Sequence, residues 1–187
     1  RVLALIPAVV VGGASLFFVQ SDVLSLNTLT PAHYAILTIG GIWWVISSLM
    51  TITYPKSSDG WQNSTILRHL FGILTLLPFF WSVLLLRAEG IDSDPYHGAK
   101  LVLFVCLLVW AADSGAYFAG KSLGKRKMAP NVSPNKTIEG LIGGILTALV
   151  VGWVAADWFD ITFTNHAVML VITLITVVIS VLGDLVE

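Results

Sequence analysis

Charged side chains are scarce in this sequence. Its 187 residues include 10 Lys and Arg and 11 Asp and Glu, so that 11% of the chain is charged. Soluble globular domains carry about 25%. So few charges could not cover a water-exposed surface, which excludes an ordinary soluble enzyme and a disordered chain. The formal net charge of -1 gives no bulk attraction to nucleic acid, which excludes a DNA-binding module.

Cysteine is also nearly absent. The one cysteine, Cys106, lies within an apolar run, so no disulfide can form within the chain. The sequence begins at Arg1 directly before an apolar run and stops at Glu187 directly after another. Neither end resembles a natural terminus, and no A-x-A-like cleavage site follows the first run. We therefore expect this sequence to be an internal part of a longer chain.

Long hydrophobic runs are abundant. Hydrophobic residues make up 56% of the chain, and the mean hydropathy is +0.87. A membrane-spanning helix needs about 20 mostly apolar residues. Six segments qualify, namely Val2–Val19, His33–Tyr54, Leu67–Leu86, Ala99–Ala119, Thr137–Ala156 and Ala167–Val186. The sequence therefore predicts an all-α, polytopic integral membrane protein that forms one membrane-embedded domain over residues 1–187.

The basic residues are unevenly distributed among the predicted loops. Half of the Lys and Arg residues lie in the loop over residues 120–136, namely Lys121, Lys125, Arg126, Lys127 and Lys136. Alternation of the spans places Arg1, Lys56 and Arg68 on the same side. Only Arg87 and Lys100 fall on the other side. Because cytoplasmic loops are enriched in Lys and Arg, we expect the loop over 120–136 to be cytoplasmic and the loop over 87–98 to lie outside.

Acidic residues inside the predicted spans are the strongest functional signal. Asp113 lies within the fourth span and Asp184 lies near the end of the sixth, so both approach the cytoplasmic side. A carboxylate at the bilayer centre costs about 2.5–3.5 kcal/mol on insertion scales, and therefore indicates a partner or a function. Pairing with a nearby Lys is the simpler alternative. Two acids at similar depth beside a basic loop favour a hydrated polar site.

The basic loop supplies the complementary charge. Ser133-Pro134 resembles a helix N-cap followed by proline at the first helical position, which predicts that the fifth helix begins there with Lys136 and Thr137 in its first turn. Free N–H groups at such a helix end form an anion site. A phosphate site facing two carboxylates suits a hard cation such as Mg²⁺ and predicts phosphoryl or nucleotidyl transfer. The basic loop alone would equally fit attraction to anionic lipid.

Residues 115–122 match the pattern of a nucleotide-binding P-loop, G-x-x-x-x-G-K-[ST]. That loop needs a strand before it and a helix after it, whereas here a predicted spanning helix precedes the pattern. We therefore interpret the glycines of this region as sites of close helix packing. These are Gly115, Gly120, Gly140, Gly143 and Gly144.

Several motifs together resemble one known family. They are Asp113-Ser114-Gly115-Ala116-Tyr117, Gly120-Lys121, Gly124-Lys125, Ala129-Pro130, Val132-Ser133-Pro134-Asn135-Lys136-Thr137-Ile138-Glu139-Gly140 and Ser180-Val181-Leu182-Gly183-Asp184-Leu185-Val186-Glu187. The set resembles the bacterial phosphatidate cytidylyltransferase, or CDP-diacylglycerol synthase, family. Asn135 stands where that family usually shows Gly. The rest of the family's C-terminal signature, and further helices before Arg1, are expected outside this sequence.

The resemblance implies a reaction in which CTP and phosphatidic acid give CDP-diacylglycerol and pyrophosphate, with Mg²⁺ as cofactor and the lipid bilayer as partner. It implies Asp113 and Asp184 as catalytic metal-site acids and Lys136 as a further catalytic residue. The substrate-binding residues that it implies are Ser114, Lys125, Ser133, Lys136 and Thr137. It also implies a location in the bacterial inner membrane with the active site on the cytoplasmic side, and it is compatible with a homodimer.

Two alternatives stay open. In an ion-coupled transporter, Asp113 and Asp184 would bind a coupling ion near the membrane centre, although Asp184 lies close to a helix end. A non-catalytic assembly subunit would require both acids to be dispensable. Because part of the expected site lies beyond Glu187, residues 1–187 alone are expected to insert into a membrane but not to turn over substrate.

Overall fold

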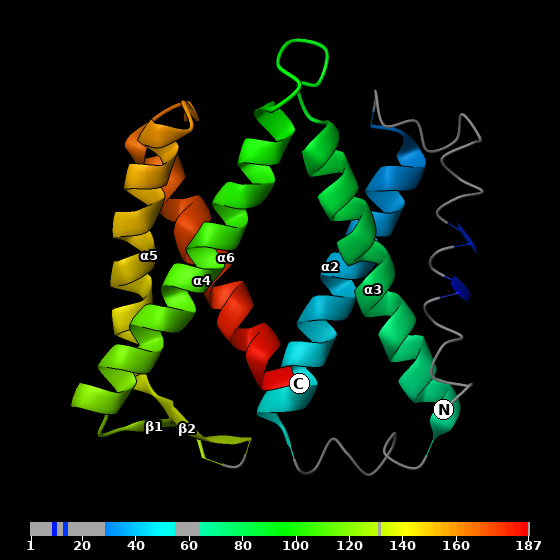
Figure 1. Cartoon of the computed structure of the whole chain (residues 1–187). Helices are drawn as coiled ribbons and strands as arrows, with labels where there is room; N and C mark the ends of the chain where they lie inside the picture. The colour runs from blue at the N-terminus through cyan, green and yellow to red at the C-terminus, as the bar shows by residue number, and fades with distance from the viewer. Residues whose placement is uncertain (1–8, 11–12, 15–28, 55–63, 131, 187) are drawn as a thin grey trace. The chain divides into compact units, whose positions relative to one another are not determined.

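The structure is a computed structural model that describes residues 9–10, 13–14, 29–54, 64–130 and 132–186. Across these residues, five helices are long and apolar enough to cross a membrane. They are α2 (Pro31–Ile52), α3 (Thr65–Ala88), α4 (His97–Leu123), α5 (Ile138–Trp158) and α6 (His166–Val186) (Figure 1). The all-α, polytopic fold class and five of the predicted spans are thereby confirmed. The first predicted span, Val2–Val19, lies almost wholly outside the described residues.

The chain divides into two compact units, Arg1–Gly98 and Ala99–Glu187. In the first unit, α2 and α3 run antiparallel and pack along each other (Figure 1). Trp43 of α2 donates its indole N–H to the Thr75 hydroxyl of α3 at 2.9 Å. Gly40 lets α2 approach the ring of Pro78, because a Cβ added there would lie 2.8 Å from the Pro78 Cγ. This helix pair is therefore closely packed around the proline of α3.

The second unit contains α4, α5, α6 and a small antiparallel sheet. Strand β1 (Lys127–Ala129) pairs with β2 (Ser133–Thr137), so that Lys127 faces Thr137 and Ala129 faces Ser133. The sheet connects the end of α4 to the start of α5. Figure 1 shows α4 and α6 running toward the strands and α5 running away from them. The ends of α4 and α6 and the start of α5 therefore meet the sheet at one end of this unit, here called the strand end.

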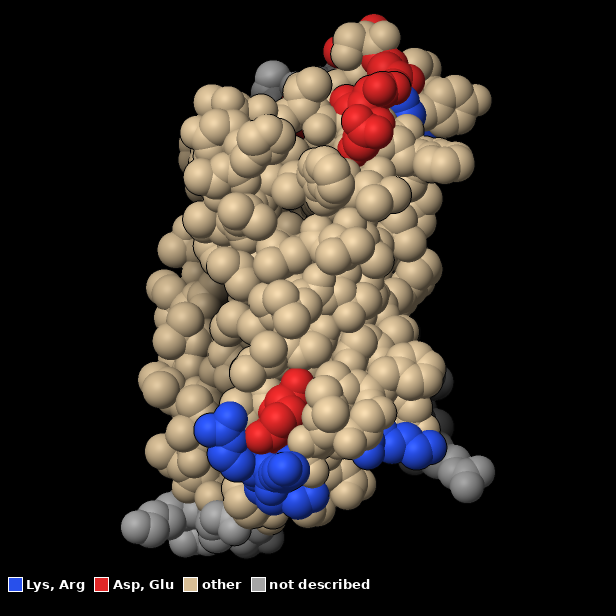
Figure 2. Space-filling model, turned by 90° about the vertical axis from the view of Figure 1, so that its left-hand side faces the viewer, with Lys and Arg blue, Asp and Glu red and all other residues tan. Residues whose placement is uncertain are grey.

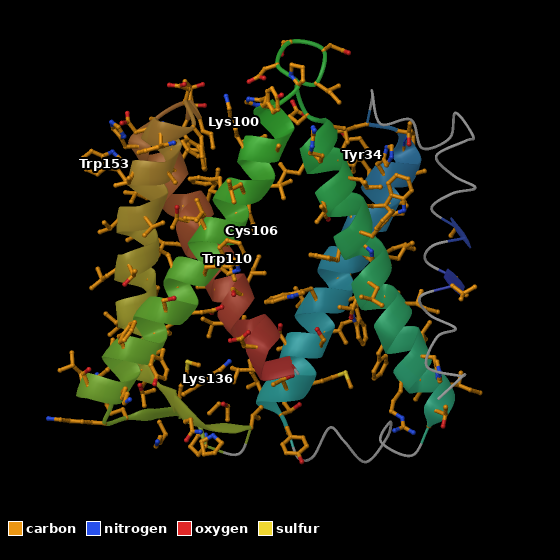
Figure 3. The ribbon with its side chains drawn as sticks, in the orientation of Figure 1. Tyr34, Lys100, Cys106, Trp110, Lys136 and Trp153 are labelled. Atoms are coloured by element: carbon orange, nitrogen blue, oxygen red, sulfur yellow. The ribbon has the colours of Figure 1, made fainter. Side chains whose placement is uncertain are left out.

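The three helices of the second unit enclose two clusters of buried apolar residues, and each cluster has members from all three helices. Leu108 of α4, Ala148 of α5 and Val177 of α6 are each fully buried. Many large apolar side chains on the same helices are exposed, as membrane-spanning helices require, among them Trp110, Trp153 and Ile175. Figure 3 shows Cys106 and Trp110 along α4, and Trp153 on α5. The buried residues fix the helix arrangement, and the exposed apolar residues suit contact with lipid.

Glycines bring α4 and α5 close together, as predicted. A Cβ added at Gly144 of α5 would lie 2.7 Å from the Ala112 carbonyl oxygen of α4. A Cβ added at Gly143 would overlap the Cβ of Ala119. The other predicted packing glycines also lie against the neighbouring helix, namely Gly115, Gly120 and Gly140. Small residues at these positions permit the close backbone approach.

Residues 115–122 lie within the continuous helix α4, which extends to Leu123. A P-loop wraps a phosphate with irregular backbone, and this segment has helical backbone throughout. The pattern therefore does not mark a nucleotide-binding loop, as the sequence context indicated.

The start of α5 differs from the prediction. Ser133 and Pro134 do not open the helix but lie in β2, and Lys136 lies in the same strand. The N-cap is Thr137, whose hydroxyl accepts a hydrogen bond from the Gly140 N–H at 3.1 Å. The physical reason is twofold: a residue before proline prefers extended backbone, and pairing with β1 provides β2 with hydrogen bonds. The predicted loop over residues 120–136 is therefore the end of α4 followed by a hairpin.

Candidate functional site

Lys136 and Asp184 form an ion pair at the strand end of the second unit. The Lys136 Nζ lies 3.2 Å from the Asp184 Oδ2. Strand β2 positions Lys136, and the last turn of α6 positions Asp184. The Lys136 side chain is 26% exposed and the Asp184 side chain 50% exposed, so the pair lies at the boundary of the protein interior. Figure 3 shows Lys136 at this end, and Lys100 at the opposite end of α4.

The Lys136 ammonium has unused donor capacity. Its Nζ atom is shielded from solvent and makes no hydrogen bond within the described part of the chain, although Asp184 lies within ion-pair distance. An ammonium carries three donors. The site therefore favours a ligand that brings acceptor oxygens to Lys136, as a phosphate group does.

Asp113 adds a second carboxylate to this pair. It is an exposed residue of α4, ten residues before the helix ends, and lies within Coulombic range of both Asp184 and Lys136. The structure therefore brings together the three residues that the sequence predicted as catalytic. Their charges are two negative and one positive, so the cluster keeps a net negative charge that a cation can neutralise.

The donor set fits a hard cation bound jointly with substrate. Among the described residues, no group of three or more His, Cys, Asp or Glu side chains converges. A closed, all-protein metal site is therefore not present in this part of the chain. Mg²⁺ commonly binds one or two carboxylates and completes its shell with water and substrate phosphates. Asp113 and Asp184 provide that number of carboxylates beside the Lys136 ammonium.

The remaining predicted substrate-binding residues lie on the same unit. Ser114 is exposed on α4 next to Asp113, and Lys125 is exposed in the turn that follows α4. Ser133 is half-buried at the start of β2. Thr137 is 7% exposed, and its hydroxyl caps α5. The observed contacts thus give Thr137 a structural task, while Lys125 and the two serines keep accessible polar groups.

The start of α5 is not the open anion site that the sequence predicted. The Ile138 N–H donates to the Arg126 carbonyl oxygen at 2.9 Å, and the Gly140 N–H donates to Thr137. Glu139 places a carboxylate in the first turn, where it complements the positive end of the helix dipole. The expectation of free N–H groups here is therefore wrong, because protein groups already accept from them.

Glu139 is a residue of this region that sequence reasoning missed. Its Oε2 accepts from the Lys125 N–H at 3.0 Å and from the Arg126 N–H at 3.1 Å. Its Oε1 accepts from the Arg126 Nε at 3.0 Å. The sequence did contain one indication of this role: Glu139 is the one acidic residue between Lys121 and the interior of the next span. An isolated carboxylate among cations is a natural partner for them.

Basic side chains gather around this end of the unit. Lys121, Lys125, Arg126 and Lys127 are exposed, and Lys121 lies over the Tyr117 ring with its Nζ 5.5 Å from the ring centroid. Figure 2 shows blue Lys and Arg atoms beside a red carboxylate group, adjoining a broad uncharged surface. Asp157 and Asp160, at the far end of α5, are exposed. The unit thus has the charge asymmetry that the sequence indicated.

Comparison with known proteins finds one matching family and several similar proteins. Residues 3–187 match the pattern described as "Cytidylyltransferase family". The chain is 44% identical to a phosphatidate cytidylyltransferase of Haemophilus influenzae over 174 residues, which cover 91% of this chain and 60% of that protein.

Two further phosphatidate cytidylyltransferases are similar. That of Pseudomonas aeruginosa is 34% identical over 82% of this chain and 54% of its own length. That of Bacillus subtilis is 33% identical over 85% of this chain and 59% of its own length. The chain therefore spans somewhat more than half of these curated relatives. No solved structure matches it.

Proposed function

Because this chain belongs to the cytidylyltransferase family, we propose that it transfers CMP from CTP to phosphatidic acid, giving CDP-diacylglycerol and pyrophosphate. One observation carries the choice of reaction: 44% identity to a phosphatidate cytidylyltransferase over 91% of the chain. The Lys136–Asp184 pair, with Asp113 nearby, supports the location of the site. The comparisons lend no support to the transporter alternative.

The proposed step is an in-line displacement at phosphorus. An oxygen of the phosphatidic acid phosphate attacks the α-phosphorus of CTP and forms the new P–O bond. The bond between the α-phosphorus and the oxygen that bridges it to the β-phosphate breaks, and pyrophosphate leaves with that electron pair. Negative charge accumulates on the transferring group and on the leaving group, so cationic side chains stabilise the transition state.

Lys136 is the residue best placed to meet that charge. Its shielded ammonium binds a phosphate oxygen with the donors that the protein leaves unused. Lys125, exposed on the neighbouring turn, binds a second phosphate group, and the Ser114 and Ser133 hydroxyls donate to the substrates. Asp184 keeps Lys136 oriented through their ion pair. These residues bind and orient two polyanionic substrates that would otherwise repel each other.

Asp184 and Asp113 would hold Mg²⁺, because their oxygen ligands suit that cation and substrate phosphates can complete its coordination. The bound ion would polarise a phosphoryl oxygen and neutralise developing charge. Thr137 contributes to the proposed site by capping α5, which keeps β2 and Lys136 in place.

The protein is a multi-pass membrane protein, and we place it in the bacterial inner membrane with the strand end on the cytoplasmic side. The cluster of Lys121, Lys125, Arg126 and Lys127 supports that orientation. CTP would then approach from the cytoplasm, and phosphatidic acid would reach the site within the bilayer. The homodimer stays a prediction.

A double-label assay tests the reaction. The full-length protein in detergent micelles receives phosphatidic acid, Mg²⁺ and CTP that carries radioactive phosphorus at either the α or the γ position. CMP transfer moves only the α label into the lipid, and EDTA stops the transfer. Label from the γ position in the lipid, or no lipid label from either position, would contradict the proposed function.

A further inference from the structure

We propose that Glu139 is a positioning residue for nucleotide binding: it fastens the turn after α4 to the first turn of α5, and so fixes the place of Lys125. The inference rests on the proposed function, because it assigns the Lys125 side chain to the phosphates of CTP. Glu139 itself touches no substrate in this account and acts through the backbone that carries Lys125.

Three hydrogen bonds join the Glu139 carboxylate to this turn. One oxygen accepts from two consecutive backbone N–H groups, those of Lys125 at 3.0 Å and Arg126 at 3.1 Å. The other oxygen accepts from the Arg126 side chain at 3.0 Å. Hydrogen bonds to an ionised acceptor are about twice as strong as neutral ones. A single side chain therefore holds two successive residues of the turn.

A second link runs in the opposite direction. The Ile138 N–H, in the first turn of α5, donates to the Arg126 carbonyl oxygen at 2.9 Å. The next residue, Lys127, begins β1 and pairs with Thr137. Backbone N–H groups and a backbone carbonyl of residues 125–127 thus both form hydrogen bonds with the first turn of α5. These bonds fix the position of the Lys125 Cα, from which the side chain extends.

Charge neutralisation is the third observation. The Arg126 side chain is 69% exposed and pairs with the Glu139 side chain, which is 20% exposed. That pairing offsets a carboxylate that would otherwise repel an approaching triphosphate. Within the described residues, the exposed side chains of Lys125 and Lys127 take part in no hydrogen bond or ion pair. The Glu139–Arg126 pair is therefore neutral as a whole, and the Lys125 and Lys127 side chains beside it remain available to an anion.

The N-cap of α5 is Thr137 and not Glu139. Thr137 already caps the helix by accepting from the Gly140 N–H. Loss of Glu139 should therefore loosen the turn over residues 124–127 and leave the helix formed. A loosened turn beside an intact helix would distinguish a positioning role from a general contribution to folding.

The test uses the full-length protein with Glu139→Ala and Glu139→Gln. Glutamine keeps an oxygen that can accept from a backbone N–H but loses the charge, so its effect should be intermediate. Asp157→Asn is the matched control, because Asp157 is an exposed carboxylate at the opposite end of the same helix. The measurements are KM and kcat for CTP, KM for phosphatidic acid, and amide hydrogen exchange of peptides covering residues 120–130 and 141–158.

For Glu139→Ala we expect the KM for CTP to rise about tenfold with kcat changed by less than about threefold, as expected for lost ground-state binding. The KM for phosphatidic acid should stay unchanged. Amides in the 120–130 peptide should exchange faster, while those in the 141–158 peptide and in Asp157→Asn keep wild-type rates. If Glu139→Ala does not fold, Glu139→Gln carries the test.

Two results would overturn the inference: unchanged exchange in the 120–130 peptide, or faster exchange there with an unchanged KM for CTP. The second would leave Glu139 with a structural role alone. Failure of the proposed function is a different result, since the wild-type protein would then form no CDP-diacylglycerol. The exchange rates would still report whether Glu139 holds the turn.

Discussion

The Lys136 ammonium lies 3.2 Å from the Asp184 carboxylate and joins strand β2 to the last turn of α6. Asp113 of α4 stands within Coulombic range of both. Three segments that are distant in the sequence thus place their charged groups at one end of the same unit. The pair also explains how an acid near a helix end is stabilised before any ligand binds.

Replacement of Lys136 by Met should reduce kcat/KM for CTP by about 100-fold or more, the effect of removing one donor that stabilises transition-state charge. The side chain keeps its length and loses its ammonium. Lys136→Arg keeps the charge and should retain part of the activity. Lys100→Met, at the opposite end of α4, is the control and should behave as wild type. Equal losses in Lys100→Met and Lys136→Met would contradict the account.

Removal of the Thr137 hydroxyl should destabilise the start of α5. Thr137→Ala leaves the Gly140 N–H without its acceptor, and loss of such a cap costs about 1 kcal/mol. Thr137→Ser should retain most of the stability. Thermal unfolding in detergent measures the difference. Thr176→Ala serves as control, because its hydroxyl only donates to the Ile172 carbonyl within α6; an equal shift in Thr176→Ala and Thr137→Ala would argue against a capping role.

A methyl group at Gly143 should force α4 and α5 apart. Its Cβ would overlap the Ala119 Cβ, and overpacking of this kind costs about 1–3 kcal/mol. The midpoint of thermal unfolding should therefore fall in Gly143→Ala. Gly72→Ala is the matched control in α3, since an added Cβ there meets nothing within 4 Å. A stable Gly143→Ala protein would mean that the two helices are not in close contact.

The orientation can be tested with a thiol reagent that does not cross membranes. In a Cys106→Ala background, Leu123→Cys should react only from the cytoplasmic side and Ser93→Cys only from the other side. Both positions are exposed, at the end of α4 and in the loop between α3 and α4. Reaction of both from the same side would be incompatible with the assigned topology and with a cytoplasmic site.

The number and type of the helices could be predicted for the described residues because a bilayer demands long apolar runs. The predicted spans Leu67–Leu86 and Ala99–Ala119 fall within α3 and α4, and the predicted span His33–Tyr54 extends two residues beyond the end of α2. Glycines predicted to pack helices do so, since small residues signal close approach whatever the exact geometry. The shared depth of Asp113 and Asp184 followed from alternation of the spans.

The hairpin and the Glu139 contacts could not be predicted in the same way. Ser133-Pro134 carries a helix-start signal, and only pairing with β1 makes it a strand. No periodicity in the sequence reveals that pairing. An acid in the first turn of a helix is already favourable because it complements the helix dipole. The sequence therefore gives no reason to expect that Glu139 also binds the turn after α4.

The most direct test of the central claim is the transfer of α-labelled CMP to phosphatidic acid by the full-length Asp184→Asn protein. The substitution removes the charge that pairs with Lys136 and serves the proposed Mg²⁺ site, while it preserves size. Asp160→Asn is the control, because Asp160 has φ of 54°, a conformation that Asn tolerates, and lies in the turn between α5 and α6. We predict that Asp184→Asn inserts into the membrane normally but forms CDP-diacylglycerol at least about 100-fold more slowly, and that Asp160→Asn keeps wild-type activity. Wild-type turnover in Asp184→Asn would contradict the assignment of the site.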